Sequence, residues 1–134
     1  MAYTSNETGR FEVYVEPFPR AAGAVGKRAV STAGGEEPRW RPDGKELFYL
    51  DPGGRLFAVP VQNSDPRLGF AMGTPTALFD TRLSREERWQ GSPTPVFRSY
   101  DVAPDGRRFL VRVVREQGAE APLVLVTNWQ ALLK

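Results

Sequence analysis

Apolar residues in this chain form short unbroken runs that are separated by turns rich in proline, aspartate and glycine. The runs Leu47–Leu50 and Leu56–Val61 do not alternate apolar with polar residues, so neither has the pattern of a strand with one face in water. Asp51–Gly54 lies between them and suits a tight turn. The pattern predicts a β-hairpin whose two strands are covered on both faces.

Similar runs and turns recur along the chain in three groups, at about 2–32, 34–81 and 98–128, with a long loop at 82–98. We predict three, four and three strands for these groups, each group forming a small antiparallel sheet. A sheet that is apolar on both faces needs similar sheets beside it, and short sheets stacked radially form a β-propeller. The sequence therefore predicts an all-β fold, with residues 1–134 forming a single partial β-propeller unit. It has about two and a half to three four-stranded antiparallel blades, which is half a propeller.

Turn chemistry assigns structural roles to residues at two matching places. Proline presets φ at the second position of a tight turn, aspartate bonds its own backbone, and glycine accepts positive φ at the exit. We expect Gly44 to need positive φ and Gly23 not to need it. Trp40 is expected in the core between sheets, and Trp129 in a terminal helical turn capped by Asn128. The structural turn and core residues are Trp40, Pro42, Asp43, Gly44, Pro104, Asp105, Gly106 and Trp129.

Composition argues against most kinds of catalysis. The chain has no histidine and no cysteine, so the usual triads, dyads and zinc sites cannot form within it. It also contains no G-x-S-x-G elbow, no phosphate-binding glycine loop and no D-x-D-x-D calcium loop. We predict no catalytic residue, no cofactor and no metal site, so the chain is not expected to be an enzyme.

Charge and hydropathy exclude two classes of partner. With 18 Lys+Arg against 16 Asp+Glu, the net charge of +2 is too small for a nucleic-acid footprint. No apolar run approaches the roughly 20 residues that span a bilayer, and the amino terminus lacks the pattern of a signal peptide. We expect no nucleic acid as a partner and no membrane insertion. Localisation stays open, and the chain as it stands is expected to be cytoplasmic.

Acidic residues are expected to have local roles. The pairs Glu36–Glu37 and Glu86–Glu87 are predicted to be solvated. Asp51 and Asp101 flank predicted strands and are expected to bond nearby backbone. These interpretations leave no acidic cluster for chemistry.

The long loop is the candidate contact for a partner. Three arginines and a tryptophan there supply bidentate donors and an aromatic plane, as partner contacts often do. These candidate residues are Arg82, Arg85, Arg88 and Trp89. Two alternatives stay open, because Ser84 with Glu87 would also suit the cap of a brief helix, and a loop of this length can have no binding role.

Two stretches carry a resemblance to a known family. The run Glu37–Tyr49 resembles the blade signature of TolB-like β-propellers, in which tryptophan, proline, aspartate and glycine precede a basic residue and an apolar strand. The run Tyr100–Leu110 resembles the same signature with tyrosine near the aromatic position. The whole chain is similar to the carboxy-terminal end of such propellers in bacterial serine/threonine protein kinases and related regulators. The resemblance implies a non-catalytic binding or scaffolding module for a protein or small-molecule ligand. The alternative is an accessory propeller domain of a larger enzyme, such as a prolyl-oligopeptidase-like hydrolase. If the chain is a fragment of a kinase sensor region, the resemblance implies an extracytoplasmic location.

The resemblance also implies self-association. A complete propeller of this family has about six blades, so half a ring would leave apolar faces open. We predict a homodimer that closes a six-bladed ring, because the first group lacks an inner strand and the last an outer one. The competing expectations are a monomer that covers its own ends and an open, aggregation-prone chain. The apolar residues expected at the open ends are Phe11, Val13, Val15, Phe109, Val111, Val113, Val124 and Val126.

Overall fold

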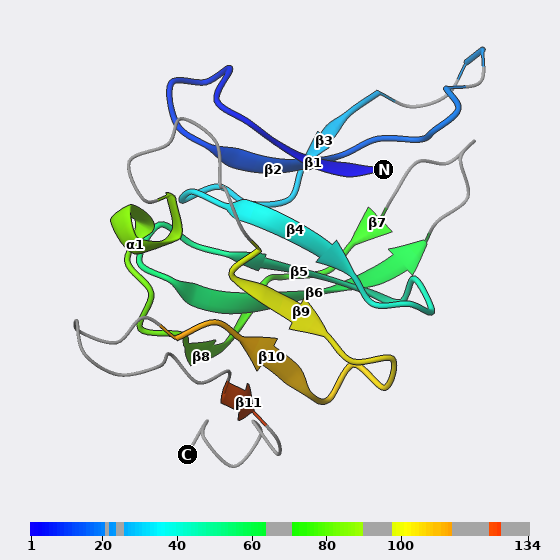
Figure 1. The fold of residues 1–134 in the computed structure, drawn as a ribbon. Coiled ribbons are helices and arrows are strands. Elements are labelled where there is room, and N and C mark those ends of the chain that lie inside the picture. Colours follow the sequence, from blue (N-terminus) through cyan, green and yellow to red (C-terminus); the bar gives the residue numbers. More distant parts are fainter. Residues whose placement is uncertain (21, 24–25, 64–70, 90–97, 114–123, 127–134) are drawn as a thin grey trace.

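Strands form nearly all the regular structure of this chain, which confirms the predicted all-β class. The computed structural model describes residues 1–20, 22–23, 26–63, 71–89, 98–113 and 124–126 (Figure 1). In these ranges there is one short helix, α1 (Arg85–Trp89). The strands are β1 (Ala2–Ser5), β2 (Glu12–Val15), β3 (Arg28–Ala29), β4 (Glu36–Trp40), β5 (Glu46–Leu50), β6 (Arg55–Asn63), β7 (Ala71–Met72), β8 (Thr76–Asp80), β9 (Tyr100–Val102), β10 (Phe109–Val111) and β11 (Val124–Val126).

The strands form three antiparallel sheets that follow one another along the chain. The first sheet has the order β1-β2-β3, and the third has the order β11-β10-β9. The second has the order β4-β5-β6-β7, with β8 also paired to β6. It holds one strand more than expected, because β6 continues beyond Val61 and pairs there with the two-residue β7. Figure 1 shows the sheets as successive layers, the arrangement of a partial propeller.

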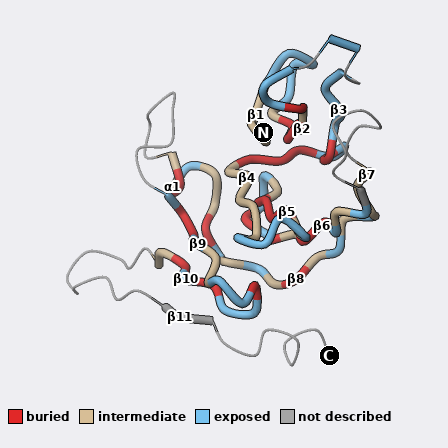
Figure 2. Tube along the Cα trace, turned by 90° about the vertical axis from the view of Figure 1, so that its right-hand side faces the viewer, coloured by how far each residue is buried: buried red, intermediate tan, exposed pale blue. Residues whose placement is uncertain are grey.

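Two apolar cores lie between these layers, one on each side of the second sheet. Successive residues of β5 point to opposite faces, so Leu47 and Tyr49 join one core while Phe48 and Leu50 join the other. Figure 2 shows buried residues gathered where the sheets face one another. The predicted hairpin with both faces covered is therefore confirmed. The core toward the first sheet comprises Val13, Val15, Val30, Leu47, Tyr49 and Val59. The core toward the third sheet comprises Phe48, Leu50, Leu56, Ala58, Leu78, Leu83, Tyr100, Phe109 and Val111.

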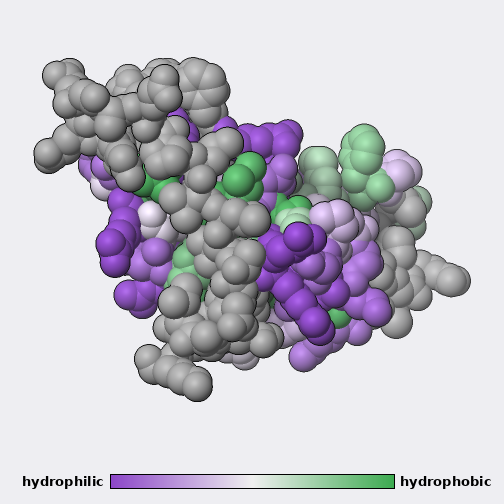
Figure 3. All heavy atoms as spheres, turned by 60° about the horizontal axis from the view of Figure 1, so that its bottom comes forward, coloured by the Kyte–Doolittle hydropathy of each residue, from purple (hydrophilic) through white to green (hydrophobic). Residues whose placement is uncertain are grey.

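The prediction that apolar residues of the first and third sheets lie exposed at open ends is wrong for four of these residues. Val13 and Val15 of β2 pack inward onto the second sheet, as do Phe109 and Val111 of β10. Because side chains alternate along a strand, it is Leu110 that faces outward from β10, with 40% of its surface exposed. The described surface visible in Figure 3 is mainly hydrophilic, with hydrophobic residues scattered over it.

The other four residues expected at the open ends differ in how far the structure describes them. Phe11 packs against the ring of Trp89, with 5.2 Å between the ring centroids. Val113 is half-buried. The side chains of Val124 and Val126 lie outside the described part of the structure.

The Pro-Asp-Gly turn between β4 and β5 has the predicted geometry. The Gly44 N–H donates to the carbonyl of Arg41 at 2.8 Å, and Gly44 has φ of 72°. The Lys45 N–H donates to Asp43 Oδ1 at 3.0 Å. Pro42 precedes these groups, as expected of the second turn position. Gly23, however, also has positive φ, 80°, so the expected contrast between the two glycines is wrong.

The turn between β9 and β10 repeats this geometry after Pro104. The Gly106 N–H donates to the carbonyl of Ala103 at 2.9 Å, and Gly106 has φ of 66°. The Arg107 N–H donates to Asp105 Oδ1 at 2.9 Å and holds the pKa of that carboxyl below its ordinary value. The two turns therefore mark matching points of two sheets, as predicted.

Structural roles were predicted for two tryptophans, and the structure describes one of them. Trp40 ends β4 half-buried and packs against the core between the first and second sheets. Trp129 lies outside the described residues. The division of residues 1–134 into one unit stays a prediction.

The start of the predicted long loop contains a capped helix. The Ser84 N–H donates to Glu87 Oε2 at 2.7 Å, and the Glu87 N–H donates to Ser84 Oγ at 3.2 Å. This capping box begins α1 and confirms the helix alternative, so Glu87 does not have the freely solvated role expected for it. Among the described residues, no helix is long and apolar enough to cross a membrane.

Candidate functional site

The candidate site lies at one end of the sheets, opposite the two Pro-Asp-Gly turns. Three connections and α1 meet there: residues 6–11, 30–35 and 51–54, and the segment 81–89 (Figure 1). The Gly35 N–H donates to the carbonyl of Phe11 at 2.9 Å, and the Thr81 N–H donates to the carbonyl of Gly54 at 3.0 Å. These backbone bonds hold segments that are distant in sequence side by side.

Glu36, at the start of β4, is the centre of this end. Its Oε1 accepts a hydrogen bond from Arg85 Nε at 2.7 Å. Its Oε2 accepts from Arg88 Nη2 at 3.1 Å and from Trp89 Nε1 at 2.9 Å. Only 2% of Glu36 is exposed, so the prediction of a solvated Glu36–Glu37 pair is wrong. The physical reason is that α1 brings three donors to one carboxylate, and these offset the cost of burying its charge.

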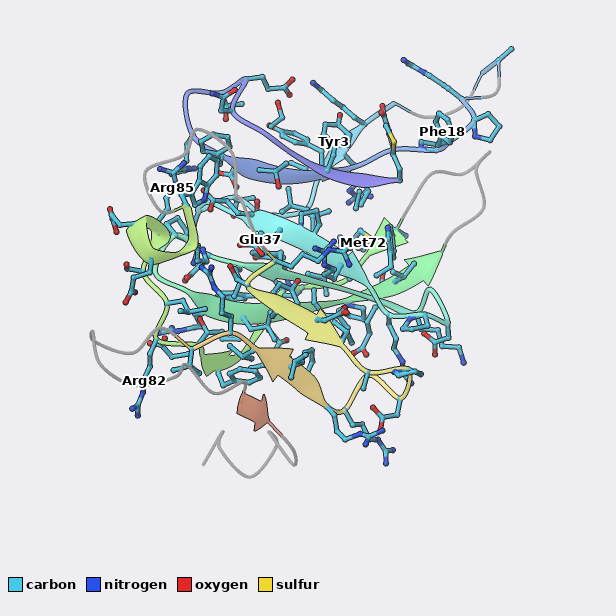
Figure 4. The ribbon with its side chains drawn as sticks, in the orientation of Figure 1. Tyr3, Phe18, Glu37, Met72, Arg82 and Arg85 are labelled. Atoms are coloured by element: carbon cyan, nitrogen blue, oxygen red, sulfur yellow. The ribbon has the colours of Figure 1, made fainter. Side chains whose placement is uncertain are left out.

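Glu37 joins the second sheet to the third. Its carboxylate accepts from the Ser99 N–H at 2.9 Å and from Ser99 Oγ at 2.7 Å. Its carbonyl accepts from the hydroxyl of Tyr100 at 2.8 Å, and burial raises the pKa of that hydroxyl well above its ordinary value. Glu37 has φ of 54°, in the left-handed region, where β4 also shifts register against β5. A non-glycine residue there costs about 1–3 kcal/mol and persists only where its surroundings hold it. Glu37 lies at the middle of the molecule in Figure 4.

Arg88 is the buried cation of the network, and its predicted role as a partner contact needs correction. None of its surface is exposed. Besides Glu36, it donates from Nη1 to the carbonyl of Leu83 at 3.3 Å and from Nη2 to the carbonyl of Asp51 at 3.2 Å. Its Nε lies 3.8 Å from a carboxylate oxygen of Glu37. Arg88 therefore acts inside the protein, as the counter-charge of two glutamates.

Arg85 differs from Arg88 because it reaches the surface. Its guanidinium carbon lies 4.9 Å from the ring centroid of Phe11 and 4.4 Å from that of Trp89. Figure 4 shows Arg85 beside α1, toward the turn between β1 and β2. Arg82 is exposed and extends away from this group. The structure thus brings three of the four predicted contact residues together and leaves Arg82 apart.

A pocket of about 390 Å³ opens beside Arg85. Besides Arg85 and the buried Glu36, it is lined by Gly9, Arg10, Phe11 and Pro52. Arg10 is held by two bonds: its Nε donates to Glu12 Oε1 at 2.8 Å and its Nη2 to the carbonyl of Thr32 at 2.8 Å. The pocket therefore combines two guanidinium groups with two apolar rings.

A second pocket has a volume of about 270 Å³. It is next to the first, because Gly34 lines the second pocket, Pro52 lines the first, and these two residues are neighbours. The parallel rings of Tyr49 and Phe57 line the second pocket, with 5.3 Å between their centroids. Burial raises the pKa of the Tyr49 hydroxyl to about 12. Asp51, also at this pocket, accepts the Arg55 N–H on Oδ1 at 2.8 Å. Asp51 thus bonds nearby backbone as expected, and Asp101 does the same by accepting the Val102 N–H at 2.9 Å.

Sequence reasoning missed Arg10, Phe11, Glu36 and Glu37 as site residues. The signal that pointed to α1 was the spacing of Ser84 and Glu87, which indicates a helix start but not what the helix contacts. Within the described ranges, no group of three or more carboxylates could hold a metal ion.

Comparison of the chain with protein-family models, with curated proteins and with solved structures finds no match. The TolB-like resemblance, and the functions it implies, therefore stay predictions.

Proposed function

We propose that this chain is a non-catalytic binding module, a TolB-like partial propeller that recognises a protein or small-molecule ligand at the loop end of its first two sheets. The observation that carries this proposal is the open pocket beside Arg85, next to a buried Glu36 carboxylate that accepts three hydrogen bonds from α1.

Preorganisation supports binding at this place. The pocket wall is formed by segments that the Gly35 to Phe11 backbone bond and the Glu36 bonds already fix. A ligand therefore orders little of the protein when it binds, and ordering is a main cost of association. Catalysis, by contrast, needs a group that is free to exchange a proton or a bond, whereas three donors occupy the carboxylate of Glu36.

The binding function is tested by nuclear magnetic resonance with the 15N-labelled chain and a chemically mixed fragment set. We expect amide shifts to cluster on Gly9–Phe11, Gly53 and Arg85. The matched reference is the opposite end, around Gly44 and Gly106, which should not respond. Shifts that are absent from the pocket, or that gather at the opposite end, would contradict the proposal. An enzymatic activity on an ester, peptide or nucleotide substrate that remains with the protein through purification would also contradict it.

Self-association is the second part of the proposal. The turn before β2 matches the turn between β5 and β6, so β1 corresponds to β5. β5 pairs with an inner strand, β4, whereas β2 is the only described strand that pairs with β1. An open edge of this kind favours addition of another strand. We therefore propose a homodimer that closes a ring.

Light scattering coupled to size exclusion tests the dimer. We expect twice the mass of one chain and an unfolding midpoint that rises with protein concentration. A single-chain mass with a concentration-independent midpoint would overturn the dimer, while leaving the pocket's binding function untouched.

A further inference from the structure

The pocket beside Arg85 presents its cations outward and buries its acids. The side chains of Arg10 and Arg85 are 58% and 40% exposed, whereas those of their partners Glu12 and Glu36 are 6% and 3% exposed. The network as a whole pairs its charges, but a group that enters from solvent meets guanidinium first. An anionic group is therefore attracted more than a cation of the same shape.

Arg85 is fixed in a geometry that suits a planar anion. Its Nε is held by Glu36, and the rings of Phe11 and Trp89 lie close to its guanidinium. Among the described residues, Arg85 donates through Nε to Glu36, and its two Nη groups are the donors that we assign to a ligand. Parallel N–H donors of this kind match the two oxygens of a carboxylate.

The rest of the lining is apolar and has room for a ring. Phe11 and Pro52 supply the apolar walls, and the volume of about 390 Å³ exceeds what a carboxylate alone would fill. We infer that the pocket binds a carboxylate carried on an apolar, ring-sized group. This inference rests on the proposed binding function and names its ligand class. The carboxylate can come from a small aromatic acid or from the end of a peptide, and the chemistry at the pocket is the same.

The experiment compares three probes that share one ring: phenylacetate, phenylacetamide and phenethylammonium. Each is titrated into the 15N-labelled chain, and affinity is taken from the shifts of Phe11 and Arg85. We expect phenylacetate to bind about tenfold more tightly than the amide, and the ammonium to bind most weakly. A further pair, the tripeptide Gly-Gly-Phe with a free or an amidated terminus, separates the two sources. Tighter binding of the free peptide than of phenylacetate assigns the ligand to a chain end, and the reverse assigns it to a small acid.

Variants test the role of the guanidinium. Arg85→Lys keeps the charge but loses the fork, so the preference for carboxylate over amide should fall to about threefold. Arg10→Met should reduce the preference independently, without removing a bond to Glu36. Arg82→Met is the matched control, an exposed arginine of the same segment that lies apart from the pocket, and it should leave all affinities unchanged.

The outcomes separate this inference from the proposed function. Equal binding of the three probes at the pocket would overturn the carboxylate preference while the binding function stands. An effect of Arg82→Met as large as that of Arg85→Lys would overturn the role of Arg85. If the mixed fragment set also leaves the pocket residues unshifted, both the inference and the proposed function fail.

Discussion

Removal of the buried carboxylate of Glu36 is the most direct test of the network. Glu36→Ala leaves Arg88, which has no exposed surface, with a nearest carboxylate oxygen 3.8 Å away on Glu37. It also removes the acceptor of Arg85 Nε and Trp89 Nε1. The variant therefore removes the ion-pair partner of a buried arginine and the acceptor of two further donors.

The expected loss of stability in Glu36→Ala follows from the buried charge of Arg88, which loses its closest ion-pair partner. Removing one partner of a buried ion pair costs about 3–5 kcal/mol, most of it the penalty of the charge left behind. Replacing Arg88 as well removes the unpaired cation but takes the counter-charge from Glu37, so Glu36→Ala with Arg88→Met should recover only part of the cost, about 2 kcal/mol relative to Glu36→Ala alone. Glu36→Gln keeps the shape but turns amide hydrogens toward donors, and its cost should lie between those of the wild type and the alanine variant.

The free energy of unfolding is measured by urea denaturation followed by tryptophan fluorescence, with circular dichroism as the second probe. The control is Glu46→Ala, whose carboxylate also pairs with an arginine, Arg41, at 3.0 Å but is partly exposed. A pair of that kind contributes about 0–1 kcal/mol. If Glu36→Ala costs no more than Glu46→Ala, or if Arg88→Met adds to its cost instead of relieving it, the reasoning is refuted.

Two further predictions concern a turn and a buried tyrosine. Gly44→Ala should cost about 1–2 kcal/mol, because Gly44 has φ of 72°; the added Cβ meets no other atom, so this cost comes from the backbone alone. Gly26→Ala is the control, since φ is not positive there, and it should cost nothing. Equal denaturation midpoints for the two variants would contradict this prediction. Because burial raises the pKa of Tyr49 from 10.0 to about 12, the stabilisation from its neutral hydroxyl is complete below pH 10 and is lost as the pH rises toward 12. Urea midpoints measured between pH 10 and 12 should fall less steeply with pH for Tyr49→Phe than for the wild type. Identical dependence of the midpoint on pH in the two proteins would contradict this prediction.

The fold was predictable from the sequence because its signals are local. The Pro-Asp-Gly turns and the unbroken apolar runs each specify their own geometry within a few residues. Both turns form as predicted, and Phe48 and Leu50 are covered on the face opposite Leu47 and Tyr49. What failed locally was the direction of side chains on the outer sheets. An apolar run such as Val13–Val15 shows that a strand is buried but not which of its faces meets the neighbour.

The site was predictable only in part, because its contacts are distant in sequence. Ser84 and Glu87 reveal the start of α1, but the bonds of that helix to Glu36 span 49 to 53 residues. Two adjacent glutamates next to a proline are typical of a solvated turn, and nothing nearby supplies the donors that bury them. Arg88 shows the same limitation from the other side, since its burial depends on carboxylates of β4.

The contact between Glu37 and Ser99 ties the repeat pattern to the question of ring closure. The two residues are separated by 62 positions, the same offset that relates Asp43 to Asp105 and Gly44 to Gly106. The bond therefore joins equivalent positions at the start of the inner strands of neighbouring sheets, with the acceptor on the second sheet and the donors on the third. The first sheet has no described inner strand, so its β1 offers no residue at this position. A second copy that closes the ring would therefore have to supply an inner strand beside β1 as well as an apolar face, and a variant that blocks the edge of β1 should abolish a dimer without affecting the Glu37 to Ser99 contact.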